Sequence, residues 1–230
     1  MIINSPGGSA AQSGLIARQI RRLADEKNVP VLAFCEDVAA SGGYLLACAA
    51  DEIFVDEYTV IGSIGVIAAS FGAVDAIDKI GVERRVHTAG KSKSLMDPFK
   101  PEKPEDIARI DTILKAIHDR FIAWVKMSRG GLLKEDIDYF QGDVWVGQAA
   151  VDVGIADGVG HMQQVVKERY GSDIRLREFG RKKPGLLARL SGQSANASLT
   201  SAAAESAGAA AAQSALGSLE DRALWARYGL

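Results

Sequence analysis

Cysteine is scarce in this sequence, and neither of its two copies belongs to a recognisable motif. Cys35 and Cys48 both lie in apolar stretches, so we expect them to be small hydrophobic side chains of the core. Two cysteines do not make a disulfide framework, and no spacing of cysteine and histidine in the chain suggests zinc. The sequence therefore predicts no bound metal and no cofactor.

Long hydrophobic runs and a strong excess of one charge are also missing. No run of 18 apolar residues is present, so we expect no transmembrane helix, and no charged-then-apolar signal peptide opens the chain. A net charge of -2 is no reason to expect nucleic acid or an acidic substrate. The 47% of hydrophobic residues in a chain of 230 are enough for the core of one α/β domain with a tail.

The composition divides the chain into a domain and a tail. We expect one domain over residues 1–177, followed over residues 178–230 by a low-complexity tail that is rich in alanine and serine and ends in a short helix. Residues 1–4 look like the last half of a strand that runs directly into a turn. Either the domain tolerates a shortened strand or residues upstream are missing from this chain, and we expect N-terminal strands to be missing.

Two glycine-rich turns, each between a strand pattern and a helix pattern, occur within the first 50 residues. The first turn, Ser5-Pro6-Gly7-Gly8, leads into a helix predicted from about Ala10 to Glu26. The second, Ser41-Gly42-Gly43, follows the apolar run Val31–Phe34. Repeated units of this kind indicate a parallel α/β arrangement with both turns at the same edge of the sheet. Steps of three and four residues predict the buried face of the first helix: Leu15, Ile16, Ile20 and Leu23.

Ser41 is the strongest candidate for a catalytic residue. It lies between two alanines and two glycines, which leave little steric cover over its hydroxyl. Glycines at this point allow a sharp backbone bend and leave amide N–H groups free at a helix start, where they favour developing negative charge. The pattern is typical of an acyl-transfer nucleophile, and the alternative is a serine that merely caps the helix.

Three later features have less specific interpretations. Ser63 lies in an apolar segment that contains glycine, and it is either part of a core bend or a polar group beside the active site. Gly90-Lys91-Ser92 resembles the end of a phosphate-binding loop, but Arg85 stands where that motif requires its first glycine, so we reject nucleotide binding. The helix predicted over Pro104–Arg129 has an apolar face that suits the core or a subunit contact.

Four motifs taken together resemble a known family. They are Asn4-Ser5-Pro6-Gly7-Gly8, Ala39-Ala40-Ser41-Gly42-Gly43-Tyr44, Gly62-Ser63-Ile64-Gly65-Val66, and Gly90-Lys91-Ser92-Lys93-Ser94 with Asp97-Pro98-Phe99. In this order they resemble the signal peptide peptidase A family of serine peptidases, and closely its compact SohB-type branch, over about residues 2 to 177. The resemblance implies a ClpP/crotonase-type α/β fold with a parallel sheet and flanking helices. It also implies a serine endopeptidase with a Ser/Lys dyad.

The resemblance assigns a role to four residues. Ser41 matches the family's nucleophile, Lys93 matches its general base, and Gly8 and Gly42 match the amides of its oxyanion hole. We add Ser63 as a candidate to hold the lysine amine by a hydrogen bond.

A lysine base has a chemical requirement that bears on its neighbours. Free lysine has a pKa near ~10.4, so a lysine acts as a base at neutral pH only when burial among apolar residues, away from carboxylates, favours its neutral form. Asp97 is close to Lys93 in sequence, so we expect its carboxylate to point away from the lysine.

The resemblance also implies partners and a location. Enzymes of the compact branch form rings in which a lysine from one subunit serves the serine of its neighbour, so we expect a homo-oligomer with a shared site. Expected substrates are extended apolar peptides, such as signal-peptide remnants or membrane-protein fragments. Membrane association or a periplasmic location would depend on an N-terminal region that this sequence lacks. Two alternatives stay open: a crotonase-like acyl-CoA enzyme and a catalytically silent scaffold that binds peptides.

Overall fold

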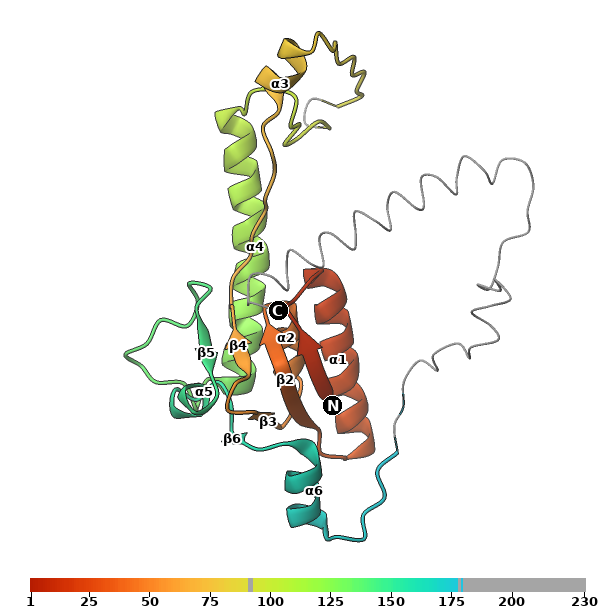
Figure 1. Cartoon of the computed structure of the whole chain (residues 1–230), viewed down its shortest axis with the longest axis vertical. Coiled ribbons are helices and arrows are strands. Elements are labelled where there is room, and N and C mark those ends of the chain that lie inside the picture. Colours follow the sequence, from red (N-terminus) through yellow and green to blue (C-terminus); the bar gives the residue numbers. More distant parts are fainter. Residues whose placement is uncertain (91–92, 178, 180–230) are drawn as a thin grey trace, which may run out of the picture. The chain divides into compact units, whose positions relative to one another are not determined.

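A computed structural model of the chain describes residues 1–90, 93–177 and 179 (Figure 1). Residues 1–161 form one compact unit, and α6 (Met162–Tyr170) belongs to the remainder of the chain. The expected tail, Phe179 apart, lies outside the described residues. The expected domain boundary after residue 177 therefore stays a prediction.

A mixed, mostly parallel sheet occupies the centre of this unit. Its strands are β1 (Ile2–Ser5), β2 (Leu32–Ala40), β3 (Glu52–Val55), β4 (Val60–Gly62), β5 (Val144–Val146) and β6 (Gly158–Val159). β2 pairs in parallel with β1, with β3 along its first half and with β4 along its second half. β6 adds in parallel to β3, and β5 is antiparallel to β4. The expected α/β class, with a largely parallel sheet and flanking helices, is confirmed.

β2 is longer than the apolar run that predicted it. The run ends at Phe34, but the strand passes through exposed Glu36 and Asp37 and continues through three fully buried residues to Ala40. The second half forms because β4 pairs with it, matching Val38 with Val60 and Ala40 with Gly62. As a result, Ser41 directly follows the last strand residue at the carboxyl edge of the sheet.

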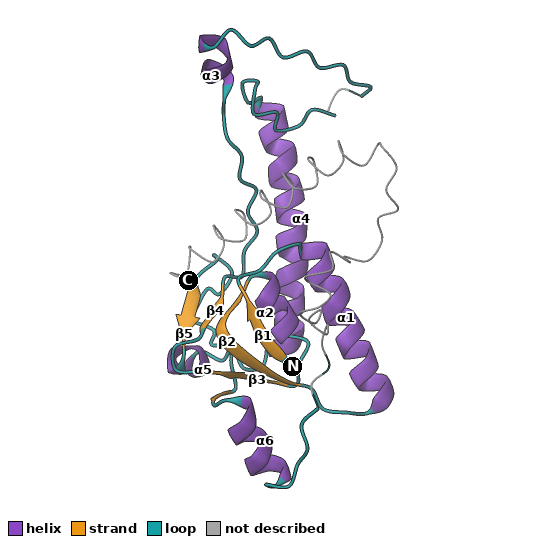
Figure 2. Cartoon of the chain, turned by 45° about the vertical axis from the view of Figure 1, so that its right-hand side comes forward, coloured by secondary structure: helices purple, strands orange, loops and turns teal. Residues whose placement is uncertain are grey.

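Five helices accompany the sheet in this unit. They are α1 (Ala10–Lys27), α2 (Gly42–Ala47), α3 (Val74–Lys79), α4 (Pro104–Arg129) and α5 (Gln148–Asp152). α1 packs on α2, and α2 in turn packs on β1 and β2 (Figure 2). Ser9 caps α1 by accepting the amide of Gln12, and α4 has the bounds that its apolar periodicity predicted. Within the described residues, no helix combines the length and the apolar character needed to cross a membrane.

The predicted buried face of α1 is largely wrong. Leu15, Ile16 and Leu23 are 43–55% exposed, and the buried residues of this helix are the small ones Ser13, Ala17 and Ala24. Small side chains allow the backbone of α1 to approach α2 closely, and this contact rather than the hydrophobic periodicity decides which side faces inward.

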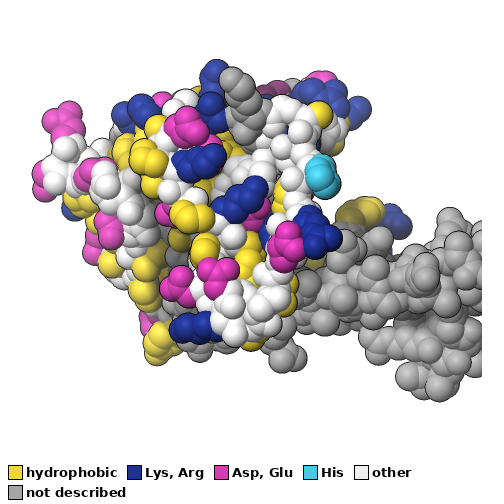
Figure 3. All heavy atoms as spheres, turned by 90° about the horizontal axis from the view of Figure 1, so that it is seen from above, with side chains coloured by type: hydrophobic (Ala, Val, Ile, Leu, Met, Phe, Trp, Pro, Cys, Tyr) yellow, Lys and Arg dark blue, Asp and Glu magenta, His cyan; other side chains and the backbone are white. Residues whose placement is uncertain are grey.

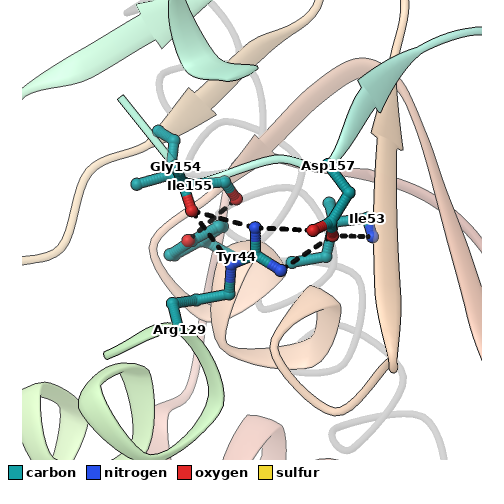
Figure 4. Close-up of polar contacts among 6 residues, drawn as sticks. All are labelled: Tyr44, Ile53, Arg129, Gly154, Ile155 and Asp157. Atoms are coloured by element: carbon teal, nitrogen blue, oxygen red, sulfur yellow. Dashed lines mark hydrogen bonds and ion pairs between the residues drawn. The ribbon is translucent and has the colours of Figure 1, made fainter. Parts of the chain in front are cut away.

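A buried polar network connects the end of α4 to the sheet (Figure 4). The Arg129 guanidinium, 2% exposed, contacts the Asp157 carboxylate at 2.7 Å and donates to the Gly154 carbonyl. The same carboxylate accepts the Ile53 amide of β3, and the Tyr44 hydroxyl of α2 donates to the Ile155 carbonyl. The network therefore joins α4, α2 and β3 beneath the helix that begins at Gly42.

α4 has two unlike halves. Its C-terminal half contributes the buried Phe121, Val125 and Arg129, whereas no residue before Phe121 is buried. The described residues from 66 to 103, which we call the arm, run from the sheet beside α4 to α3, and α3 lies beyond the N-terminal end of α4 (Figures 1 and 2). The C-terminal half of α4 thus belongs to the core, and the N-terminal half leads to the arm.

Candidate active site

The candidate site lies where three parallel strands end. β1 ends at Ser5, β2 at Ala40 and β4 at Gly62, and the pairing brings these ends to one edge of the sheet. The Ser41 amide donates to the Gly62 carbonyl at 2.9 Å, which continues the β2–β4 ladder by one residue. The expectation that both glycine turns share a sheet edge is therefore correct.

Ser41 has an unusual backbone conformation. Its φ of 52° and ψ of -117° place a residue with a side chain in a region that strongly favours glycine. Gly147, at the start of α5, has nearly the same angles, and there the chain does use glycine. Strain of this kind persists where the surrounding structure enforces it, and it occurs at functional sites. The Ser41 side chain does not cap α2, and its hydroxyl has no hydrogen-bond partner among the described residues.

The two glycine turns fit into each other around Ser41. A Cβ atom on Gly7 would lie 2.9 Å from the Ser41 Cβ and 3.3 Å from its Oγ. A Cβ atom on Gly43 would lie 2.6 Å from the Ser5 carbonyl oxygen. Contacts this short exclude any side chain at these two positions, so both glycines are required by packing.

Two backbone amides meet beside the serine. A Cβ atom on Gly42 would lie 2.5 Å from the Ser13 Oγ and 3.5 Å from the Gly8 nitrogen, so Gly8 and Gly42 are close neighbours. Gly42 is the first residue of α2, and Gly8 lies just before the cap of α1. Neighbouring N–H groups at helix starts can stabilise an oxyanion. The sequence singled out both glycines, but nothing in it indicated that Gly7 contacts Ser41 or that Ser13 packs against Gly42.

Ser63 lies next to the same edge. It directly follows Gly62, has a φ of 52°, and donates its amide to the Asp143 carbonyl at 2.7 Å. Its half-buried side chain makes no hydrogen bond to another described residue. Ser63 is thus close to the Ser41 backbone, as expected for a polar group beside the site.

His118 of α4 is a neighbour that the sequence did not reveal. Its Nε2 lies 3.2 Å from the carbonyl oxygen of Ile64, the residue after Ser63. This contact connects α4 to the segment that follows β4, so His118 stabilises the backbone next to Ser63. Nothing in the local pattern of α4 distinguishes this histidine from an exposed one.

Within one chain, Lys93 lies far from the other candidate residues. The Trp124 indole of α4 donates to the Leu45 carbonyl of α2 at 3.1 Å, which places Trp124 beside the helix that Ser41 begins. The helix from Pro104 to Trp124 extends roughly 30 Å away from that contact. Lys93 is exposed and belongs to the arm, whose helix α3 lies beyond the N-terminal end of α4 (Figure 1).

The cysteines are unsuited to nucleophilic chemistry. Burial is the main cause that raises the pKa of each thiol, Cys35 and Cys48, to about 12, so neither forms a thiolate at neutral pH. Both are free and buried, as the sequence predicted. Among the described residues, no group of three or more potential metal ligands is present.

Sequence comparison relates this chain to a family of peptidases. The model of Peptidase family S49 matches residues 23–171. The chain is 36% identical over 165 residues to "Serine protease SPPA, chloroplastic" of Arabidopsis thaliana, a match that covers 71% of this chain and 24% of that protein. It is 45% identical over 237 residues to a Brucella abortus protein named "Na(+)/H(+) antiporter NhaA", covering 99% of this chain. The chain spans only 31% of that relative.

Among solved structures, a variant of the membrane-bound stomatin-specific protease 1510-N matches with a TM-score of 0.33 and 15% identity. The match covers 73% of this chain and 67% of that one.

Proposed function

This chain belongs to Peptidase family S49, and from that membership we propose that it is a serine peptidase with Ser41 as nucleophile and Lys93 as general base. Gly8 and Gly42 form the oxyanion hole, and Ser63 holds the lysine amine. The family brings with it the ClpP/crotonase-type fold expected from the motifs. The antiporter name of the Brucella relative is not extended to this chain, because the chain matches 31% of that protein and this segment matches a peptidase family.

The proposed reaction moves one proton between two side chains. Neutral Lys93 accepts the hydroxyl proton as the Ser41 Oγ bonds to the carbonyl carbon of the substrate. The carbonyl oxygen becomes an oxyanion that the amides of Gly8 and Gly42 stabilise. When the C–N bond breaks, the leaving amine takes the proton from Lys93. Water, activated by the same lysine, then hydrolyses the ester and restores Ser41.

The conformation of Ser41 is the observation that carries this proposal. Its backbone is strained, it is in close contact with Gly7, and its hydroxyl makes no hydrogen bond to a described residue, while Gly8 and Gly42 are close neighbours next to it. A serine that only capped the helix would bond to the first turn of α2, and Ser41 does not. The arrangement favours a nucleophile over a cap.

The separation of Lys93 from Ser41 supports a site shared between subunits. Because the arm lies roughly 30 Å along α4 from the contact with α2, a lysine on the arm of one subunit would reach the serine of a neighbour. The exposed N-terminal half of α4 supplies surface for such a contact. We therefore propose a homo-oligomer whose substrates are extended apolar peptides.

Labelling with a fluorophosphonate tests the nucleophile. The wild-type protein should be labelled and should hydrolyse peptides, whereas Ser41→Ala should lose both properties and keep its far-UV circular dichroism. Lys93→Ala and Lys93→Arg should both be inactive, because arginine stays protonated and cannot accept the serine proton. Labelled Ser41→Ala protein would overturn the assignment. A crotonase-like enzyme or a silent scaffold would leave the wild type unlabelled.

A further inference from the structure

The Asp97 carboxylate is the most densely bonded acidic group of the arm. Its side chain is 2% exposed, although it lies on a loop. Oδ2 accepts the Ser94 hydroxyl at 2.9 Å, and Oδ1 accepts the Phe99 amide at 3.1 Å. The Arg84 guanidinium contacts Oδ1 at 3.1 Å, and the Lys100 ammonium lies 3.9 Å from Oδ2. A carboxylate is almost never this buried unless it is paired, and the partners of Asp97 come from both sides of its loop.

These bonds set the backbone next to the candidate base. Ser94, which donates to Asp97, directly follows Lys93, and the Lys93 amide donates to the Gly90 carbonyl at 3.2 Å. Met96, which lies between Ser94 and Asp97, has a φ of 54°, a strained value for a residue with a side chain of this size. Asp97 therefore holds the turn that directly follows Lys93 through its bonds to Ser94 and Phe99.

Arg84 neutralises this carboxylate. Desolvation acts to raise the pKa of Asp97, but hydrogen bonds from Phe99 and Ser94 and the charges of Arg84 and Lys100 outweigh it and lower that pKa, so Asp97 is ionised at neutral pH. The Arg84 guanidinium is also held over the Phe99 ring at 4.8 Å. Lys93 has no ion pair with any described residue, so Arg84 and Lys100 are the cations that reach Asp97.

We propose that Asp97 and Arg84 are positioning residues for Lys93: Asp97 shapes the loop that presents the lysine, and Arg84 occupies the Asp97 carboxylate so that it does not pair with the lysine. The inference rests on the proposed function, since it concerns the base of that reaction. Neither residue touches the substrate. Their role is to keep an anion that the loop needs from stabilising the protonated form of the base that the loop carries.

The test measures kcat for peptide hydrolysis against pH in Arg84→Met, Asp97→Asn and the double variant. Arg84→Met leaves Asp97 with a weaker partner and favours its pairing with Lys93. The pH at which kcat reaches half its maximum should then rise by roughly 1 unit, because a nearby carboxylate favours a charged lysine. Asp97→Asn should lower kcat without raising that midpoint. In the double variant the Asp97 carboxylate is absent, so the pH midpoint of kcat should return to the wild-type value or below it.

Arg85→Met is the matched control. Arg85 is the adjacent arginine in sequence, and it pairs at 2.7 Å with the exposed Glu83 rather than with Asp97. Its loss should leave both kcat and the midpoint unchanged. A purely structural role for Arg84 and Asp97 predicts a different pattern: lower kcat or thermal stability in all three variants, the double variant worst, and no displaced midpoint.

The outcomes separate this inference from the proposed function. If Lys93→Ala is inactive but Arg84→Met keeps the wild-type midpoint, the positioning role is refuted and the dyad stands. If Lys93→Ala retains wild-type turnover, the proposed base is wrong, whatever the Arg84 variant shows. A raised midpoint in Arg84→Met that Asp97→Asn reverses supports both.

Discussion

At the scale of single residues, the candidate site is built by steric contacts between backbone and small side chains. Gly7 lies directly against Ser41, and Gly42 has room for no side chain beside Ser13. These contacts hold Ser41 at a φ that costs about 1–3 kcal/mol for a residue with a side chain. The chain retains that cost at a position where the Ser41 hydroxyl does not cap the helix and where Gly8 and Gly42 are close neighbours, which is the residue-level case for catalysis.

Gly42→Ala should inactivate the protein through a clash with Ser13, and Ser13→Ala should relieve that clash. The new Cβ would lie 2.5 Å from the Ser13 Oγ, so α1 and α2 must shift apart and carry the amides of Gly8 and Gly42 with them. We expect destabilisation of about 1–3 kcal/mol and loss of peptide hydrolysis. Adding Ser13→Ala removes the clashing oxygen and should restore most of both, measured by thermal unfolding and turnover.

Gly131→Ala is the control for that experiment. A Cβ atom there meets no atom within 4 Å, so neither stability nor turnover should change appreciably. If Gly42→Ala alone behaved like Gly131→Ala, the close packing of the two turns would not be a requirement of the site.

At the scale of elements, α4 has different functions at its two ends. The C-terminal half is held in the core by Phe121, Val125 and the Arg129–Asp157 pair. The N-terminal half is exposed and leads to the arm that carries Lys93. Seen from above in Figure 3, basic, acidic and hydrophobic side chains are interspersed on this face, without dominance of one sign of charge. Figure 3 therefore shows a mixed surface on the arm side.

Breaking the buried ion pair should destabilise the protein strongly. Asp157→Asn leaves the Arg129 guanidinium, 2% exposed, without a counter-charge, and we expect a loss of about 3–5 kcal/mol in the free energy of unfolding. The double variant Arg129→Met with Asp157→Asn should lose less than the sum of the single losses. Urea denaturation measures all three. Lys115→Met, which removes an exposed i,i+4 pair on the same helix, should leave the urea midpoint unchanged. Additive losses would show that the pair is not coupled.

At the scale of the whole molecule, one chain holds the serine and the lysine on parts that α4 separates. The shared site that we propose would resolve this separation, because the arm of a neighbour would supply the base. The same arrangement would make activity depend on assembly of the subunits, because an isolated subunit would have no lysine beside its serine.

Mixing two inactive proteins tests the shared site. Ser41→Ala retains Lys93, and Lys93→Ala retains Ser41, so after subunit exchange about a quarter of randomly formed sites should combine both intact residues. Peptide hydrolysis should recover to that fraction of the wild-type rate. Ser41→Ala mixed with the double variant Ser41→Ala with Lys93→Ala is the control and should stay inactive. Confirmed hetero-oligomers without activity would mean that both residues act within one chain.

The sequence alone determined the features that depend on local physics. Turn chemistry located the glycine turns and the strand–turn–helix units, and the apolar period located α4 from Pro104 to Arg129 with its observed bounds. The same local signals predicted that the two glycine turns, with Gly8, Ser41 and Gly42, share one sheet edge, because parallel strands end on the same side. For Ser63 they left a core bend as the alternative.

Only the tertiary structure decided which surfaces and groups meet. The buried face of α1 was mispredicted, since its small residues pack against α2 while Leu15, Ile16 and Leu23 stay exposed. The full length of β2 depends on its pairing with β4, and the ion pair of Arg129 and Asp157 joins residues that no local pattern relates. The distance between Ser41 and Lys93 follows from where α4 meets α2. Such contacts link residues far apart in sequence, so only the folded chain specifies them.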